Sequence, residues 1–193
     1  MAFGNLKFYQ GQLTAHPEVG NRTLEGVQPW VVVDTAGCGF DEVRSAEGGS
    51  VSNLDEADFV LDRAVEWLTM HPGISLGIVA PYAAQVEALR EGWSERLRAQ
   101  PALREAAVTI HTVDGFQGQE RDAMLVSLTR SNDKGEVGFL SESRRIHVAQ
   151  TRAKMACMLV GDSATLSSDP FLADLFDFAQ AHDAYDSAWS WVV

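Results

Sequence analysis

The sequence predicts an α/β fold, a three-layer sandwich in which helices cover both faces of a mostly parallel β-sheet. Apolar runs recur along the chain, and several of them lack polar alternation, which is typical of strands buried on both faces of a parallel sheet. Helical patterns lie between these runs, and such alternation predicts right-handed crossover connections. The length of 193 residues gives room for one domain with a full core.

Strands are expected at the five clearest apolar runs. These are WVVVD at 30–34, LGIVAP at 76–81, AVTIHTV at 107–113, AMLVSLT at 123–129 and ACMLVG at 156–161. Together with the helical segments between them, they indicate a RecA-like or Rossmann-like sandwich.

Helices are expected at residues 53–70 and 83–99, with a shorter one from Pro170. Asn53 suits the N-cap of the first helix, because its side chain can accept a hydrogen bond from a free backbone N–H. Apolar residues recur at helical spacing in both long segments. They are Leu54, Ala57, Leu61, Ala64, Val65 and Leu68 in the first helix and Val86, Leu89, Trp93 and Leu97 in the second.

The chain divides into one lobe at residues 1–182 and a C-terminal tail at 183–193. Within the lobe, the segment 35–52 is rich in glycine and has no sustained period, so we expect a long loop there. The tail carries Trp189 and Trp191, which either pack back on the lobe or mark a contact with a partner. We favour packing on the lobe.

Signals for export, membrane insertion and metal binding are missing from the sequence. No apolar run approaches the ~20 residues of a membrane span, and the start MAFGNLKFYQ lacks the pattern of a signal peptide. We therefore expect a cytoplasmic protein with no membrane partner. Cys38 and Cys157 lie far apart, so neither a disulfide framework nor a metal site is indicated.

The charge distribution is uneven. A net charge of −12 argues against a surface that coats nucleic acid through clustered Lys and Arg. The window from Arg121 to Lys154 reverses this balance, since its seven basic and four acidic residues give +3 and leave −15 for the rest. A solvated helix face explains any single Arg in this window, but the window as a whole favours an anionic ligand.

The stretch IHTVDGFQGQE at 110–120 is the first chemical signal. A strand-like run ends in a loop with two glycines, two glutamines and a carboxylate but no positive charge, and glycine marks sharp turns or close approach. Both this stretch and VAPY at 79–82 are expected at the carboxyl ends of strands, where α/β sheets bind ligands. Further on, a helix beginning near Ser141 would place Arg145 and Arg152 about two turns apart on one face. Arginine forks bind phosphate and a carboxylate accepts from ribose, so the combination suits a nucleotide.

The motifs taken together resemble the second, C-terminal RecA-like lobe of superfamily 1 helicases, in the branch of the nonsense-mediated-decay and immunoglobulin-mu-binding helicases. The resemblance rests on GIVAPYAAQV, VTIHTVDGFQGQERDAMLVSLTRSN, GEVGFL and RRIHVAQTRAK, in that order. It extends upstream through KFYQGQL, VVVDTAGCG and SVSNLDEA, and so covers roughly residues 7–165. It implies a RecA-like lobe that works with ATP and single-stranded DNA or RNA.

On the nucleotide side, the resemblance implies four roles. DGFQGQE looks like helicase motif V, in which Glu120 would bind the ribose and Gln117 would couple the nucleotide site to the strand site. VAQTRA looks like motif VI, in which Arg152 would be the catalytic arginine finger that stabilises the phosphoryl-transfer transition state. Arg145 would support that helix or the nucleotide.

On the nucleic-acid side, APYAAQ looks like motif IV, and the resemblance implies that Pro81 and Tyr82 face the single strand, where a tyrosine can stack on a base. Thr112 and Val113, at the strand end before motif V, would lie against the nucleic-acid backbone. Such contacts do not distinguish DNA from RNA.

Simpler interpretations compete with several of these roles. Tyr82 could be a surface aromatic after a proline turn, Glu120 could cap a strand, and Arg145 could pair with Glu142 at helical spacing. Isolated histidines such as His111 and His147 are more often packed than catalytic.

The sequence also departs from the family pattern. It has no GxxxxGK[ST] phosphate loop and no metal-binding Asp-Glu pair after a strand, so ATP and its Mg²⁺ would need an N-terminal RecA-like lobe in the same or another chain. We expect no ATP hydrolysis by this chain alone. His147 stands where the family has Asn, and Gln150 where it has Leu. The alternative function is a non-catalytic helicase-lobe module that binds protein or nucleic acid.

Overall fold

A six-stranded parallel sheet forms the centre of the computed structural model, which describes residues 2–12, 14, 22–45 and 49–192. The strand order is β5-β4-β6-β7-β1-β8, and every neighbouring pair runs parallel. The strands are β1 (Trp30–Asp34), β4 (Ser75–Ala80), β5 (Ala107–Thr112), β6 (Arg121–Ser127), β7 (Ala153–Gly161) and β8 (Tyr185–Ser187). The predicted α/β sandwich is therefore confirmed, and the five predicted strands form five of its six strands.

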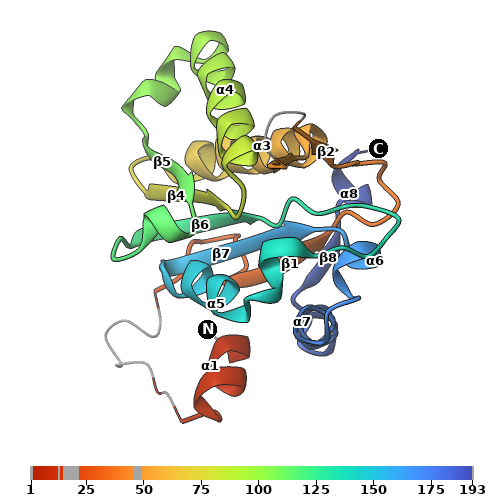
Figure 1. Cartoon of the computed structure of the whole chain (residues 1–193). Helices are drawn as coiled ribbons and strands as arrows, with labels where there is room; N and C mark the ends of the chain where they lie inside the picture. The colour runs from red at the N-terminus through yellow and green to blue at the C-terminus, as the bar shows by residue number, and fades with distance from the viewer. Residues whose placement is uncertain (1, 13, 15–21, 46–48, 193) are drawn as a thin grey trace.

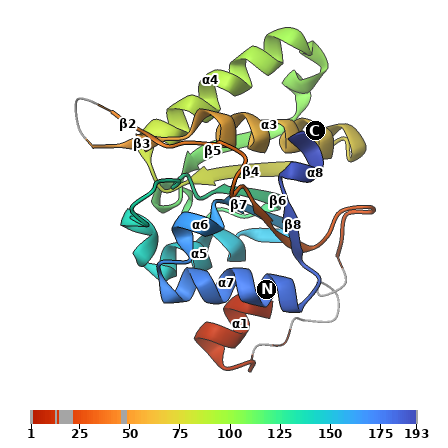
Figure 2. The same cartoon turned by 90° about the vertical axis from the view of Figure 1, so that its right-hand side faces the viewer.

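Helices cover both faces of this sheet, which makes three layers (Figures 1 and 2). On one face lie α3 (Leu54–Met70) and α4 (Ala83–Ala99), and on the other lie α1 (Ala2–Tyr9), α5 (Ser143–Thr151) and α7 (Pro170–Ala181). The shorter elements are β2 (Val43–Arg44), β3 (Val51–Ser52), α6 (Ser163–Leu166), α8 (Trp189–Val192) and the 3₁₀ turns η1 (Pro101–Glu105), η2 (Asp114–Phe116) and η3 (Gly138–Ser141).

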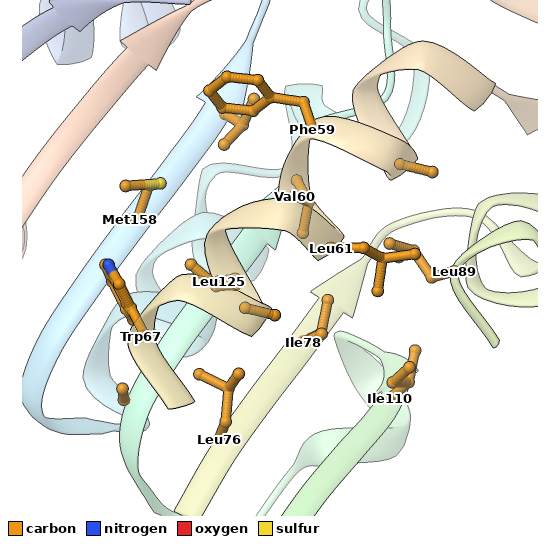
Figure 3. Packing of buried hydrophobic residues seen from close by; sticks show 14 of the residues in the cluster. Phe59, Val60, Leu61, Trp67, Leu76, Ile78, Leu89, Ile110, Leu125 and Met158 are labelled. Carbon is orange, nitrogen blue, oxygen red and sulfur yellow. The ribbon is translucent and has the colours of Figure 1, made fainter. Parts of the chain in front are cut away.

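Each face of the sheet has its own hydrophobic core, because successive side chains of a strand point to opposite faces. Val31 and Val33 of β1 lie in the core under α3 and α4, whereas Val32 lies in the core under α5 and α7. Figure 3 shows the first of these cores, with Leu61 and Trp67 of α3 above the apolar strands. This double burial explains why four of the five predicted strands, all except the edge strand β5, carry almost no polar residues.

The cap predicted for the first helix is confirmed, and the helix from Pro170 has a cap that was not predicted. The Asn53 side chain accepts a hydrogen bond from the backbone N–H of Glu56 at 3.0 Å, and Asp169 caps α7 in the same way just before Pro170. Of the apolar stripe predicted on α3, Leu54 alone is exposed. The helix expected near Ser141 begins at Ser143 instead, because η3 occupies the preceding residues.

The loop and the tail both contain more structure than their sequences indicate. Strands β2 and β3 form a small antiparallel hairpin within residues 35–52. In the tail, β8 pairs with β1, and Trp191 packs edge-on against Phe59 with a 5.7 Å centroid distance. The described part of the tail thus packs on the lobe, although Trp189 stays 51% exposed. Among the described helices, none has the length and apolar character needed to cross a bilayer.

A buried carboxyl group joins α3 to the end of β6. Glu56 is fully buried, and its Oε1 accepts hydrogen bonds from the Ser127 hydroxyl at 2.5 Å and from the Thr129 backbone N–H at 2.8 Å. Burial raises the pKa of Glu56 to about 7, although these two hydrogen bonds act in the opposite direction. Glu56 therefore links stability to pH.

Glu56→Gln is expected to flatten the pH dependence of stability between about pH 4.5 and pH 7. The folded state holds the Glu56 proton more tightly than the unfolded chain does, so the wild-type free energy of unfolding falls as the pH rises through this window and levels off above it. Glutamine keeps an oxygen acceptor for Ser127 and Thr129 but does not titrate. Urea unfolding at several pH values measures the slope, with Glu66→Gln on the exposed side of α3 as the control. An unchanged slope in Glu56→Gln would contradict this assignment.

Candidate nucleotide and nucleic-acid interface

The loop between β5 and β6 connects the two ends of the parallel strands. We call the side of the sheet where the strands end the carboxyl edge and the side where they begin the amino edge. Strand β5 ends at Thr112, and the backbone N–H of Val113 donates to the Ala80 carbonyl at the end of β4, at 3.2 Å. Glu120 comes directly before the first residue of β6. Because β5 and β6 are parallel, the loop must return from the carboxyl edge to the amino edge. The expectation that the whole stretch lies at the carboxyl edge is therefore wrong for Glu120.

Packing explains the glycines of this loop. A Cβ at Gly115 would lie 1.9 Å from the ring of His111, so only glycine allows that contact. The His111 Nδ1 accepts a hydrogen bond from the Thr112 backbone N–H at 2.9 Å, which gives His111 a structural role. Phe116 anchors the turn in the core with 1% exposure. The anchored turn leaves Gln117 exposed.

Glu120 and Arg152 lie side by side at the amino edge. The Arg121 backbone N–H donates to the Arg152 carbonyl at 3.0 Å, which brings the start of β6 beside the start of β7. Glu120 is exposed, and Arg152 is half-buried with its Nε donating to the Val148 carbonyl at 3.3 Å. Within the described ranges, no ion pair engages either side chain. The backbones of Glu120 and Arg152 are thus neighbours at this edge, where the Glu120 carboxylate is exposed and the Arg152 guanidinium lies against the last turn of α5.

Helix α5 separates the two arginines that were expected to face one ligand. Arg152 caps its C-terminus at the amino edge, whereas Arg145 lies in its first turn, seven residues and roughly 10 Å earlier along the helix. Arg145 forms ion pairs with Asp114 and with Glu142, each at 3.4 Å. Arg145 therefore lies beside the start of the motif V loop, and the competing interpretation, a pair with Glu142 at helical spacing, describes one of its two ion pairs.

Gln117 and Arg145 share a hollow between the two edges. Its volume is about 190 Å³, and its lining also includes Val113 and Val148. Val113 itself is 4% exposed, so only its surface in this hollow is accessible. The hollow connects the motif V loop with the motif VI helix.

Tyr82 does not face solvent at the carboxyl edge. It is 4% exposed, and its hydroxyl accepts hydrogen bonds from Arg130 Nη1 and from the Phe139 backbone N–H, both at 3.2 Å. Its ring stacks on Phe139 at 5.1 Å between centroids. Tyr82 is therefore neither the exposed strand contact nor the surface aromatic considered above. Pro81 and Thr112 beside it are half-buried and keep some accessible surface.

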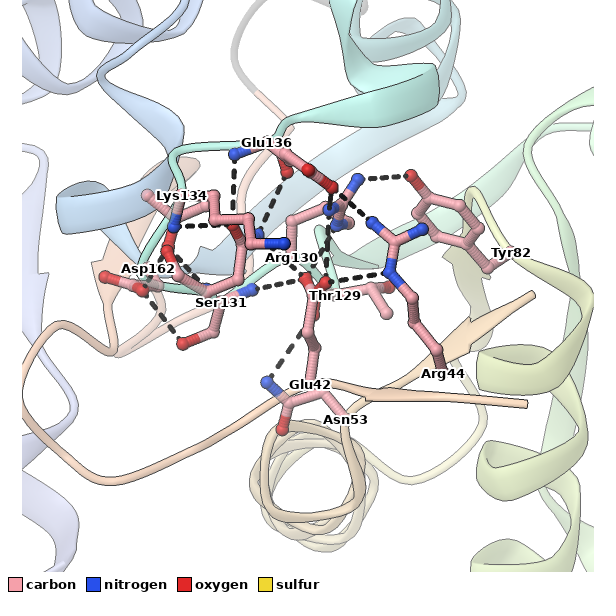
Figure 4. A network of polar contacts seen from close by, with 12 residues as sticks. Glu42, Arg44, Asn53, Tyr82, Thr129, Arg130, Ser131, Lys134, Glu136 and Asp162 are labelled. Atoms are coloured by element: carbon pink, nitrogen blue, oxygen red, sulfur yellow. Dashed lines mark hydrogen bonds and ion pairs between the residues drawn. The ribbon is translucent and has the colours of Figure 1, made fainter. Parts of the chain in front are cut away.

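A buried ion pair supports this edge and was not predicted from the sequence. Arg130 is 2% exposed and binds Glu42 through two contacts, Nε to Oε2 at 2.6 Å and Nη2 to Oε1 at 3.1 Å. Glu42 also accepts from the Ser131 backbone N–H and the Asn132 side chain (Figure 4). The network joins the segment 35–52 to the residues after β6. The available signal was an arginine directly after an apolar run, in LTRSN.

The two departures from the family pattern are accommodated by packing. The His147 ring lies 4.4 Å from the Phe8 ring of α1, and burial together with the nearby Arg152 charge lowers its pKa. Gln150 is 4% exposed and accepts a hydrogen bond from the Trp30 indole at 3.0 Å. Both residues therefore contact elements that pack against α5, and each has one buried nitrogen, His147 Nδ1 and Gln150 Nε2, without a hydrogen-bond partner among the described residues.

The fold and the ordered motifs define the class of protein. A parallel sheet with helices on both faces, motifs IV, V and VI in that order, and no phosphate loop in the sequence describe a RecA-like lobe of the helicase type. A family model described as "AAA domain" matches residues 1–164. The chain belongs to this family and is the C-terminal lobe of a superfamily 1 helicase, in the branch of the regulator of nonsense transcripts.

Comparisons with individual proteins agree with this placement. DNA-binding protein SMUBP-2 of Mesocricetus auratus is 37% identical over 95% of this chain, and the probable helicase MAGATAMA 3 of Arabidopsis thaliana is 36% identical over 93%. The chain spans only 19% and 23% of these two relatives. A solved C-terminal domain of a possible DNA helicase from Lactobacillus plantarum WCFS1 is similar in fold, with a TM-score of 0.52 and 19% identity over 83% of this chain and 86% of that one.

Proposed function

We propose that this chain is the C-terminal motor lobe of an ATP-dependent DNA or RNA helicase, in which it completes the ATP site and grips single-stranded nucleic acid. The observation that carries the proposal is the placement of Glu120 beside Arg152 at the amino edge, without ion-pair partners among the described residues. The accessible parts of Pro81 and Thr112 lie at the opposite edge. One lobe thus offers separate surfaces for nucleotide and strand.

The donor set at the amino edge fits a nucleotide. The Glu120 carboxylate can accept hydrogen bonds from ribose hydroxyls, and the Arg152 guanidinium can bind a phosphate as a fork. When bound, ATP supplies the phosphoryl group that is transferred to water. Arg152 then stabilises negative charge on the transferring group. In this proposal Mg²⁺ is held by an N-terminal RecA-like lobe in the same or another chain.

The motif V loop suits the coupling of ATP to strand movement. It begins at Thr112 beside the proposed strand path and ends at Glu120 beside the proposed ATP site. Gln117 and Arg145 meet in the hollow between them. Closure of the two lobes around ATP would displace Glu120 and, through this anchored loop, change the grip of the carboxyl edge on a single strand.

Glu120→Ala is expected to raise the KM for ATP about tenfold in a two-lobed helicase that contains this lobe, because a charge-assisted hydrogen bond to the ribose is lost. The kcat should change much less, since the ribose does not react. Steady-state ATPase assays with saturating single strand measure both constants. Glu87→Ala, which removes an exposed carboxylate of α4, is the matched control. An unchanged KM in Glu120→Ala would contradict the ribose assignment.

A non-catalytic binding module is the second candidate function. The net charge of −12 and the 51% exposure of Trp189 favour it. A module of this kind has no need of an arginine finger at Arg152 or of a ribose contact at Glu120. Strand-dependent ATP hydrolysis that requires Arg152 distinguishes the helicase lobe from the module.

A further inference from the structure

An exposed aromatic ring stands at the carboxyl edge. Phe139 in η3 is 54% exposed, and its ring stacks on the buried ring of Tyr82 with an interplanar angle of 29°. Single exposed apolar residues are common and need no explanation by themselves. The way in which Phe139 is held distinguishes it from such residues.

Buried groups fix the position of Phe139. Its backbone N–H donates to the Tyr82 hydroxyl at 3.2 Å. The preceding Gly138 has a φ of +56°, and a Cβ there would lie 2.2 Å from the Tyr82 hydroxyl and 2.4 Å from Arg130 Nη1. The turn therefore rests directly on the Tyr82–Arg130 pair, and the Glu42 ion pair holds Arg130 in turn. A ring held in this way loses little conformational freedom when a ligand binds.

A hollow that is large enough for a nucleobase adjoins the ring. Its volume is about 460 Å³, and Phe139, Tyr82 and Val51 provide its apolar lining. Figure 4 shows Arg44 and Tyr82, which both line this hollow, with the strands of the hairpin below them in the view. Small-molecule sites typically occupy about 300–1,000 Å³, so the hollow can admit a nucleobase.

Two cations flank the ring and the hollow. The Arg44 side chain is 53% exposed and pairs with Glu136, and the Arg145 guanidinium lies 5.4 Å from the Phe139 ring centroid. Arg145 itself is 24% exposed and lies over the Phe139 ring, but its partners Asp114 and Glu142 are exposed, as is the Arg44–Glu136 pair. Ion pairs with exposed carboxylates contribute little, so phosphate oxygens can compete for both arginines. The arrangement combines an aromatic platform with cations, which is how proteins bind single strands without sequence preference.

We propose that Phe139 is the platform on which one base of the single strand stacks, with the base in the hollow beside the β2–β3 hairpin and Arg44 and Arg145 facing the adjoining phosphates. This inference rests on the proposed function. The sequence suggested Tyr82 as the aromatic residue that contacts the strand, and this inference assigns that contact to Phe139, whose ring stacks on Tyr82. Stacking makes no use of base edges, so binding at this position should not depend on the identity of the base.

The test measures binding of a fluorescein-labelled single-stranded oligonucleotide to the chain by anisotropy at low salt. Phe139→Ala and Phe139→Leu should weaken binding about tenfold, whereas Phe139→Tyr should retain it, because only an aromatic ring stacks. Trp189→Ala removes a similarly exposed aromatic ring and should leave affinity unchanged. Far-ultraviolet circular dichroism verifies that each variant is folded.

An oligonucleotide with abasic sites tests whether the contact with Phe139 is made by a base. The wild-type chain should bind it more weakly than the intact strand, and Phe139→Ala should bind both equally. A 5-iodouracil strand should crosslink to the peptide that contains Phe139. If Phe139→Ala binds the intact strand as tightly as the wild type does, the stacking inference is overturned and the strand-binding function stands. If the wild-type chain neither binds nor crosslinks to any single strand, the proposed function itself fails.

Discussion

Arg152→Ala is expected to lower the ATP turnover of a two-lobed helicase that contains this lobe by about a thousandfold or more, with little change in single-strand affinity. The guanidinium is the group that would stabilise charge on the transferring phosphoryl group. It lies at the amino edge, away from the carboxyl edge that we assign to the strand. The loss should therefore appear in kcat, whereas loss of Glu120 should appear in KM. Single-turnover ATP hydrolysis and strand anisotropy measure the two properties separately.

Two further variants control for charge and geometry. Lys154→Ala removes a positive charge from an exposed position two residues away and should leave turnover nearly unchanged. Arg152→Lys keeps the charge but loses the planar fork, so most of the loss should persist. If the ATP turnover of Arg152→Ala stays within a few-fold of wild type, the assignment of Arg152 as the arginine finger is contradicted.

Arg130→Ala is expected to reduce the free energy of unfolding by about 3–5 kcal/mol, because it leaves the carboxylate of Glu42 buried without its main partner. A loss of this size corresponds to a fall in melting temperature of roughly 10 °C. The same change removes a hydrogen-bond donor to Tyr82 and the support under the Phe139 turn. Thermal unfolding followed by circular dichroism measures the effect.

Burial of the pair is the feature that this prediction depends on. Arg44→Ala breaks an exposed ion pair in the same network and should cost less than about 1 kcal/mol. Replacing both buried charges, with Arg130→Met and Glu42→Leu together, should be less damaging than Arg130→Ala alone, since no unpaired charge remains. Equal losses for Arg44→Ala and Arg130→Ala would show that burial of the pair is unimportant.

Much of the fold could be predicted because its signals are local. Four of the five predicted strands, all except the edge strand β5, are almost entirely apolar because they contribute side chains to the cores on both faces of the sheet. The Asn53 cap marks the start of α3 within its own first turn. Two elements lacked such a signal. Helix α1 depends on Phe3, which packs against Trp30 and Phe171 from distant parts of the chain. Strand β8 has only three residues and forms because β1 offers it a partner.

The motifs predicted which residues form the candidate site but not how these residues are arranged in space. Motif spacing named Glu120 and Arg152, but only the pairing of β6 with β7 places them together. The same spacing could not indicate that Phe139 covers Tyr82, because 57 residues separate them. Likewise Arg130 and Glu42 are 88 residues apart, and no local pattern connects them.

Strand β8 also has a consequence for solubility. Strand β1 is apolar along most of its length, and an edge strand of that kind would be a template for intermolecular β-pairing and aggregation. The short β8 occupies that edge, and it presents Tyr185, Asp186 and Ser187 in place of valines. A charge on a short edge strand discourages further strand addition. The tail residues of β8 thus cover the apolar strand β1 and protect it from pairing with a strand of another molecule.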